Sequence, residues 1–190
     1  SFQDRQVNIL NGATLTVSVP MALDTVMMEE DAQVVFTATE GKLTARSLRF
    51  APLLSATGWK AFGMPFTSAV IKNSTEEEIS APSAQNVDNG IWFARLKDNK
   101  TPEFVVDESA FGMAGLWAAN GDTYTISSEG AFEFKTLEEP AAPTETGTFL
   151  MCSNPNTFTI TLKQSAYILT ADGTSFEQEA NPEIKPFQSF

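Results

Sequence analysis

The chain has 190 residues, among them 24 Asp or Glu, 12 Lys or Arg, one cysteine and no histidine. The absence of histidine excludes Ser-His-Asp and Cys-His nucleophiles and imidazole-ligated metals, so we expect a protein that is not an enzyme and has no cofactor. The formal charge of −12 disfavours nucleic acid and anionic lipid as partners. No stretch approaches the roughly 20 apolar residues of a membrane span, so no membrane insertion by this segment is expected.

Apolar and polar residues alternate with a period of two in the N-terminal part of the chain. Residues 14–19, 33–39 and 42–50 each follow this pattern, which is typical of half-buried strands. The last two segments flank Glu40-Gly41, and a short glycine-containing turn between two alternating runs predicts a β-hairpin. We therefore expect a small β region over residues 1–55.

Asn11-Gly12 has the sequence of a two-residue hairpin turn. A tight hairpin at this point would pair Ile9 with Thr14 and so place an apolar side chain beside a polar one. Register follows the apolar pattern when one face of a sheet is buried. We therefore expect a longer loop or a bulge here instead of a tight turn.

The middle of the chain holds the one candidate helix and a second predicted hairpin. Residues 74–79 begin with hydroxyl side chains that can cap a helix and continue with three glutamates that suit a helix N-terminus. One or two helical turns are expected there. Residues 123–126 and 131–135 alternate on either side of a Ser-Ser-Glu-Gly turn and predict a hairpin.

These patterns, together with the strict alternation of residues 157–163, predict an all-β protein. Strand is expected above roughly 40% and helix below roughly 10%, and no tandem repeat of solenoid period is apparent. We expect an antiparallel β-sandwich or jelly-roll-like module over residues 56–190, separate from or continuous with residues 1–55. One core is predicted to contain Phe62, Met64, Phe66, Phe158, Ile160, Leu162 and Phe187.

Three segments resemble a known family: residues 57–66 (TGWKAFGMPF), 165–176 (SAYILTADGTSF) and 184–190 (IKPFQSF). Together they are similar to the β-rich module at the C-termini of large secreted surface proteins of Bacteroides-type anaerobes, often downstream of leucine-rich repeats. The chain departs from that pattern at Ala61 and Gly63, where Thr and Cys are common. The resemblance implies an extracellular or cell-surface location and a non-catalytic accessory role. It implies no catalytic residue.

Tryptophan gives the sharpest binding hypothesis, because an exposed indole face can stack on a sugar ring. Trp117 lies close to a turn and Trp92 follows a glycine in an aromatic run, so these two are the candidate ligand-binding residues. Trp59 is expected in the core, since tryptophan is highly buried on average.

Two single residues suggest chemistry of their own. Asp24-Thr25-Val26 matches the short acceptor for O-glycosylation in Bacteroides-type bacteria, which makes Thr25 a candidate modification site. Cys152 follows two apolar residues and is expected to be a buried, unreactive thiol. Clusters of Asp, Asn and Gly contain no Asp-x-Asp-x-Asp run and are interpreted as turns, so no metal site is expected.

Three functions follow from these observations. The first is a non-catalytic module of a surface protein for adhesion, spacing or presentation, with an unknown protein or glycan as its ligand. The second is a carbohydrate-binding module that uses an exposed tryptophan. The third is a fimbrial or pilin-like subunit, in which a strand of a partner completes an open sheet.

Overall fold

The computed structural model describes the following parts of the chain: residues 3–37, 41–54, 59–79, 90–97, 101–120, 122–134, 136 and 151–190. The structure is all-β with 55% strand, which confirms the all-β class and the predicted strand content. In the described part, the one helical element is the 3₁₀ turn Glu108–Ala110. Residue 40 of the predicted Glu40-Gly41 turn, and residues 57 and 58 of the family-like segment, lie outside the described residues.

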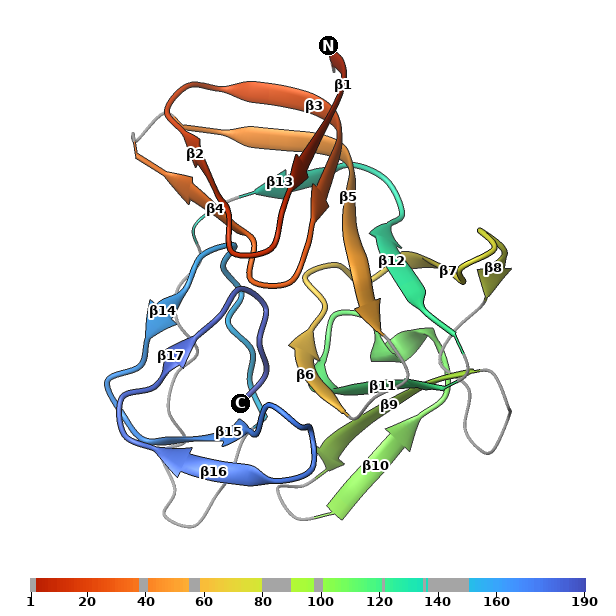
Figure 1. The fold of residues 1–190 in the computed structure, drawn as a ribbon, viewed down its shortest axis with the longest axis vertical. Coiled ribbons are helices and arrows are strands. Elements are labelled where there is room, and N and C mark those ends of the chain that lie inside the picture. Colours follow the sequence, from red (N-terminus) through yellow and green to blue (C-terminus); the bar gives the residue numbers. More distant parts are fainter. Residues whose placement is uncertain are drawn as a thin grey trace.

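The strands form several sheets, of which the largest is mixed and open (Figure 1). Its order is β1-β3-β5-β12-β7-β8, with β13 also paired to β5; a second sheet has the order β10-β9-β11-β6, and three strand pairs are β2–β4, β14–β17 and β15–β16. The strands are β1 (Gln3–Ile9), β2 (Thr14–Val17), β3 (Met21–Met28), β4 (Gln33–Phe36), β5 (Leu43–Leu54), β6 (Lys60–Gly63), β7 (Ala69–Lys72), β8 (Glu78–Ile79), β9 (Gly90–Lys97), β10 (Thr101–Val105), β11 (Ala114–Asn120), β12 (Tyr124–Ser128), β13 (Phe132–Phe134), β14 (Ile160–Thr161), β15 (Ala166–Leu169), β16 (Phe176–Glu179) and β17 (Glu183–Ile184).

The N-terminal part is built from parallel coils. β1 pairs with β3, β3 pairs with β5, and β2 pairs with β4, all in parallel (Figure 1). Gln6 lies opposite Thr25, and Thr25 lies opposite Ser47. Each coil therefore contains two strands joined by a turn and stacks on the next coil.

Stacking brings apolar residues of successive coils into continuous interior rows. The repeat is visible only in the pairing, because few positions keep their residue type from one coil to the next. The absence of a sequence repeat of solenoid period therefore does not conflict with the stacked pairing of the strands. The interior rows are Val7–Val26–Leu48 and Ile9–Met28–Phe50.

The Asn11-Gly12 segment is a tight turn, in contrast to the expected loop or bulge. The amide of Ala13 donates to the carbonyl of Leu10 at 2.9 Å, and Gly12 has a φ of 70°, a conformation that glycine adopts without a steric penalty. The predicted mismatch of faces does not arise, because the strands on either side of the turn pair with the next coil and not with each other. Asp31 holds the same place in the second coil and has a φ of 62°.

Both predicted hairpins are wrong for the same reason. The strand β4 pairs with β2, whereas β5 pairs with β3. Further along the chain, β12 and β13 both pair with β5, with Ile126 opposite Phe50 and Phe132 opposite Ala45. β5 is twelve residues long, which gives it room for two successive antiparallel partners. Alternation predicts which face of a strand is buried, but it does not identify the strand with which that strand pairs.

The segment predicted to be a short helix, residues 74–79, forms the connection from β7 and then β8 itself. The side chain of Asn73 accepts hydrogen bonds from the amides of Thr75, at 3.0 Å, and Glu77, at 2.9 Å. These bonds satisfy the same backbone donors that a helix N-terminus would leave free. Short polar side chains compete with helix formation in this way, so the expected helix at residues 74–79 is wrong.

The predicted single core is divided in two. Phe62, Met64 and Phe187 are buried in the main cluster, which also includes residues of the coils, and Phe66 packs against it. The other three members belong to a separate small cluster, in which Ile160 and Leu162 are buried and Phe158 packs beside them. The main cluster extends from the coils into the second sheet. The strand β5 pairs with β3, which precedes the predicted boundary at residue 55, and with β12, which follows it.

Gly115 on β11 allows an unusually close approach of an aromatic ring. A Cβ atom at this position would lie 2.2 Å from the ring of Phe93 and 2.8 Å from the carbonyl oxygen of Ala94. We expect Gly115→Ala to lower the free energy of unfolding by about 1–3 kcal/mol, the usual cost of overpacking, as measured by urea denaturation. The double variant Gly115→Ala/Phe93→Leu should recover part of this loss; strictly additive effects would contradict the proposed clash.

The C-terminal segment closes the structure against the free edge of β6. The amide of Gly63 donates to the carbonyl of Phe187 at 2.7 Å, and the amide of Ser189 donates to the carbonyl of Ala61 at 3.2 Å. A Cβ atom at Gly63 would lie 2.2 Å from the Ser153 hydroxyl. The small residues of this strand therefore allow a close approach of the C-terminal segment, and the strand ends at Gly63, before Pro65.

Candidate functional site

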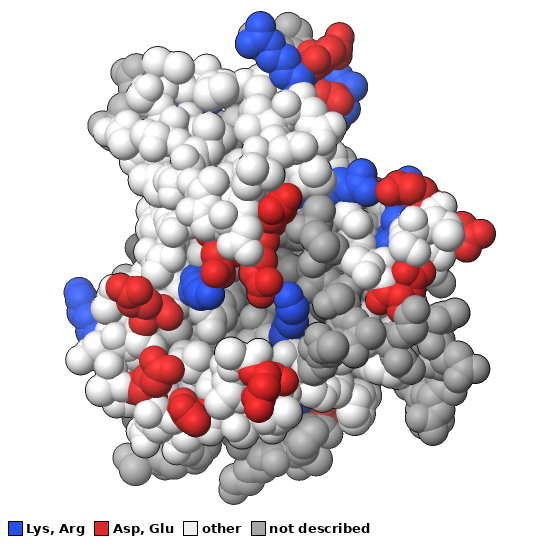
Figure 2. Space-filling view, viewed as in Figure 1, with Lys and Arg blue, Asp and Glu red and all other residues white. Residues whose placement is uncertain are grey.

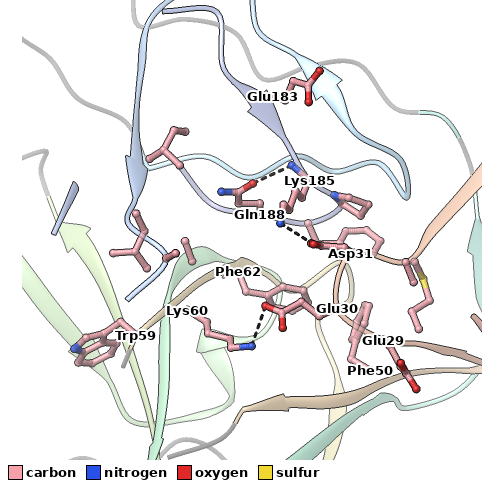
Figure 3. A pocket seen from close by; sticks show the side chains of 18 of the residues that line it. Glu29, Glu30, Asp31, Phe50, Trp59, Lys60, Phe62, Glu183, Lys185 and Gln188 are labelled. Carbon is pink, nitrogen blue, oxygen red and sulfur yellow. Dashed lines mark hydrogen bonds and ion pairs between the residues drawn. The ribbon is translucent and has the colours of Figure 1, made fainter. Parts of the chain in front are cut away.

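A cleft of about 430 Å³ lies where three distant parts of the chain meet (Figure 3). The turn after β3 provides Glu29, Glu30 and Asp31, and the start of β6 provides Trp59 and Lys60. The segments around β15–β17 and the C-terminal loop complete the lining, with residues 168–171 and 185–188 among them. The C-terminal segment packs beside the coils but does not cover the turn at residues 29–31, and the cleft lies between them.

Two ion pairs join the turn of the second coil to the opposite walls of the cleft. Lys60 Nζ lies 3.1 Å from Glu30 Oε1, and Lys185 Nζ lies 2.7 Å from Asp31 Oδ2 (Figure 3). Figure 2 shows that acidic and basic side chains gather where the coils meet the lower part of the molecule. Partly exposed pairs contribute at most about 1 kcal/mol each to stability. Their position matters more, since they place charged donors and acceptors along the cleft.

The floor of the cleft is apolar. Phe50, Phe62 and Phe187 line it and pack edge to face, with ring centroids 5.1 Å apart for the first pair and 5.5 Å for Phe50 and Phe187. All three rings belong to the buried core. The base of the cleft is therefore the outer edge of the packed core, with the polar lining groups above it, an arrangement found in many small-molecule sites.

One wall is held by the turn between β15 and β16. Asp172 Oδ1 accepts hydrogen bonds from the Thr170 hydroxyl at 2.6 Å and the Thr174 hydroxyl at 2.8 Å. The hydrogen bond from Thr170, followed by those from Thr174, lowers the pKa of Asp172. Thr170 itself lines the cleft, so these hydrogen bonds within the turn hold one wall of the cleft in place.

Trp59 lies at one end of the cleft, opposite the end that holds Glu29 (Figure 3). Its side chain is half-buried, and its ring centroid lies 6.2 Å from that of Phe104, whose side chain is 57% exposed. The expectation that Trp59 belongs to the core does not hold, since it is absent from the buried core of the described residues. The expectation rested on the average burial of tryptophan, whereas the alternation that buries Phe62 and Met64 places Trp59 on the opposite face of the strand.

Trp92 lies on the outer face of the second sheet. Its neighbours Ile91 and Phe93 on β9 point into the core, so alternation places Trp92 on the opposite face. It is half-buried there, and Leu96 on the same face is 40% exposed. Cross-strand register adds Phe104, opposite Ala94, to this face.

Trp117 is not an exposed platform. Its side chain is fully buried, with the ring centroid 4.8 Å from that of Phe93 and 6.4 Å from that of Phe111. The strand β11 continues to Asn120. Trp117 therefore lies within the strand, and the expectation that a neighbouring turn exposes its indole is wrong. The structure therefore excludes Trp117 from stacking on a ligand in this folded state.

Thr25 lies in the middle of β3, between β1 and β5. Its register neighbours are Gln6 and Ser47, and the adjacent Asp24 forms an ion pair with Arg46 at 3.0 Å. The side chain is half-buried and belongs to a row of polar residues, whereas the next row, which contains Val26, is buried. Its glycosylation remains a prediction, which intact-mass measurement on the native protein tests.

Cys152 pairs with the last residue of the chain through its main chain. Its amide donates to the carbonyl of Phe190 at 3.0 Å, and the amide of Phe190 donates back at 2.9 Å. Burial raises the pKa of the Cys152 thiol, so less reactive thiolate is present at neutral pH. We expect slower reaction with Ellman's reagent than for an exposed cysteine, and recovery of the full rate in denaturant; equal rates in both conditions would contradict this.

In the described part of the chain, no group of three or more Cys, Asp or Glu side chains is placed to hold a metal ion. Among the same residues, no helix is long and apolar enough to cross a bilayer.

No family model, curated protein or solved structure matches the chain.

Proposed function

We propose that this chain is a non-catalytic module of a cell-surface or secreted protein, and that it serves adhesion by binding a ligand in the cleft. The resemblance of residues 57–66, 165–176 and 184–190 to surface-protein modules supports the extracellular location. The arrangement of residues 56–190 as a β-sandwich belongs to the same proposal. The chain's charge of −12 favours ligands other than nucleic acid and anionic membranes.

The observation that carries this proposal is the construction of the cleft. An apolar aromatic floor lies beneath polar walls, and the walls come from parts of the chain that are far apart in sequence. Two ion pairs connect these parts across the opening. Such a combination of a preformed apolar base with a few placed polar groups is the usual form of a binding site.

Binding through the cleft is tested with a pair of matched charge reversals. Lys185→Glu removes the ion pair with Asp31 inside the cleft, whereas Lys42→Glu removes an exposed ion pair with Glu133 on β13. Wild type and both variants are compared on an array of glycans and peptides from host and bacterial surfaces. We expect Lys185→Glu to lose the wild-type signal and Lys42→Glu to keep it. Equal signals for both variants, or no wild-type signal at all, would contradict the proposal.

A second function is favoured by the open edge of the coils. β1 is the edge strand of the main sheet and, among the described residues, pairs only with β3. An unpaired edge offers main-chain donors and acceptors to the strand of another molecule, as in a fimbrial subunit. Sedimentation velocity at increasing concentration tests this function. Polymers that grow with concentration would support it, and a monomer at all concentrations would exclude self-assembly through this edge.

A further inference from the structure

We propose that the cleft binds a neutral glycan and that Trp59, together with Phe104, forms the platform on which a sugar ring stacks. This inference rests on the proposed binding function and specifies its ligand. Trp117, the candidate from the sequence, is fully buried. The stacking residue proposed instead is Trp59, which was expected in the core.

The aromatic evidence is the position of the two rings. Trp59 lines the cleft and is half-buried, so part of its indole remains available to a ligand. Phe104 does not line the cleft itself but lies next to Trp59, with ring planes inclined by 48° and a side chain that is 57% exposed. Aromatic rings with an open face provide a large, rigid contact area, and the C–H groups on one side of a sugar ring form a matching apolar surface.

The polar lining matches hydroxyl groups better than charged groups. Lys60 and Lys185 offer donors, Glu30 and Asp31 offer acceptors, and Gln188 offers both. A sugar hydroxyl both donates and accepts, so it can bridge the two members of each ion pair. A purely anionic or cationic ligand would use only one half of each pair and would oppose the other.

The charge around the cleft selects against acidic glycans. Both lysines of the lining are already paired with carboxylates, and three further acidic residues line the same cleft: Glu29, Glu179 and Glu183. An acidic polysaccharide therefore meets an excess of negative charge. The ligand class that fits both the aromatic platform and this electrostatic field is an uncharged oligosaccharide.

The test is a titration of the chain with a neutral glucan, a neutral mannan and polygalacturonate. Binding is measured by tryptophan fluorescence and by calorimetry. We expect saturable binding of at least one neutral glycan and none of polygalacturonate. Trp59→Ala should weaken binding by about tenfold or more, in the range of a binding hot spot. Trp59→Phe should retain most of the affinity. Val106→Ala, which removes an exposed apolar side chain beside β10, is the matched control and should leave affinity unchanged.

The outcomes separate this inference from the proposed function. If no neutral glycan binds, but Lys185→Glu still abolishes binding of a peptide or protein on the array, the glycan inference is overturned and the binding function stands. If a neutral glycan binds wild type and Lys185→Glu equally, the cleft is not the site and the proposed function fails. If glycan binding depends on Lys185 but is unaffected by Trp59→Ala, the stacking platform is overturned. Thermal melts of each variant verify that it is folded.

Discussion

Replacement of Phe187 by alanine is expected to lower the free energy of unfolding by about 3–5 kcal/mol, the usual cost of truncating a buried aromatic residue. The side chain is 1% exposed, and its ring packs edge to face on Phe50 and Phe62. Its backbone has a φ of 58°, a conformation that bulky residues rarely adopt and that the surrounding contacts must maintain. The ring therefore anchors the C-terminal segment, and with it one wall of the cleft.

Phe176→Ala is the matched control for this prediction. Its ring is 39% exposed, and substitutions of exposed residues usually change stability by no more than about 0.5 kcal/mol. Urea denaturation followed by circular dichroism gives both values. Similar losses for the two variants would show that Phe187 does not anchor the segment to the core.

The second large effect is expected for Asn154→Asp, which should cost about 3–5 kcal/mol, as for an uncompensated buried charge. The side chain of Asn154 is fully buried. Its Nδ2 donates to the carbonyl oxygens of Phe158, Ile184 and Lys185 at 2.8–3.0 Å, and its Oδ1 accepts from the amide of Asn156 at 2.9 Å. A carboxylate has no hydrogen to donate and would face three carbonyl oxygens.

This prediction has a defined pH dependence. The introduced carboxyl group is buried beside acceptors, so its folded-state pKa lies above its unfolded value. The folded state then binds more protons than the unfolded state, and the loss of stability should decrease as pH falls through the folded pKa. Asn8→Asp, at an exposed position on β1, is the control and should show neither effect. A loss at Asn154 that is independent of pH would contradict a charge-based cause.

The sequence pattern predicts the strands of this protein better than their partners. Alternation at residues 14–19 and 42–50 predicts β2 and β5 correctly, because a half-buried strand requires it. The same alternation is satisfied by a hairpin neighbour or by a parallel neighbour one coil away, and the coils repeat too few residue types to reveal which. Gly12 and Asp31 both have a positive φ and hold the same corner of successive coils. This equivalence is visible in the structure but not in the two residue types.

The cleft could not be predicted from local patterns. Its two lysines and their carboxylate partners are 30 and 154 residues apart in the chain, so only the folded structure brings them together. The prediction for Trp117 depends on a neighbouring turn and that for Trp59 on the average burial of tryptophan, and the packing in the folded structure contradicts both. Trp117 continues the buried face of β11, whereas Trp59 precedes the first residue of β6 and lies beside the exposed Phe104.

The central claim, that the cleft is the ligand site, is tested most directly by hydrogen–deuterium exchange of the chain with and without a glycan or peptide that it binds. We predict slower exchange in three segments that are distant in sequence: residues 29–31, 59–62 and 185–188, which together line the cleft. Residues 14–17, on the coil edge, should be unaffected and provide an internal control. Protection confined to β1 and β2, with none in the three cleft segments, would contradict the account.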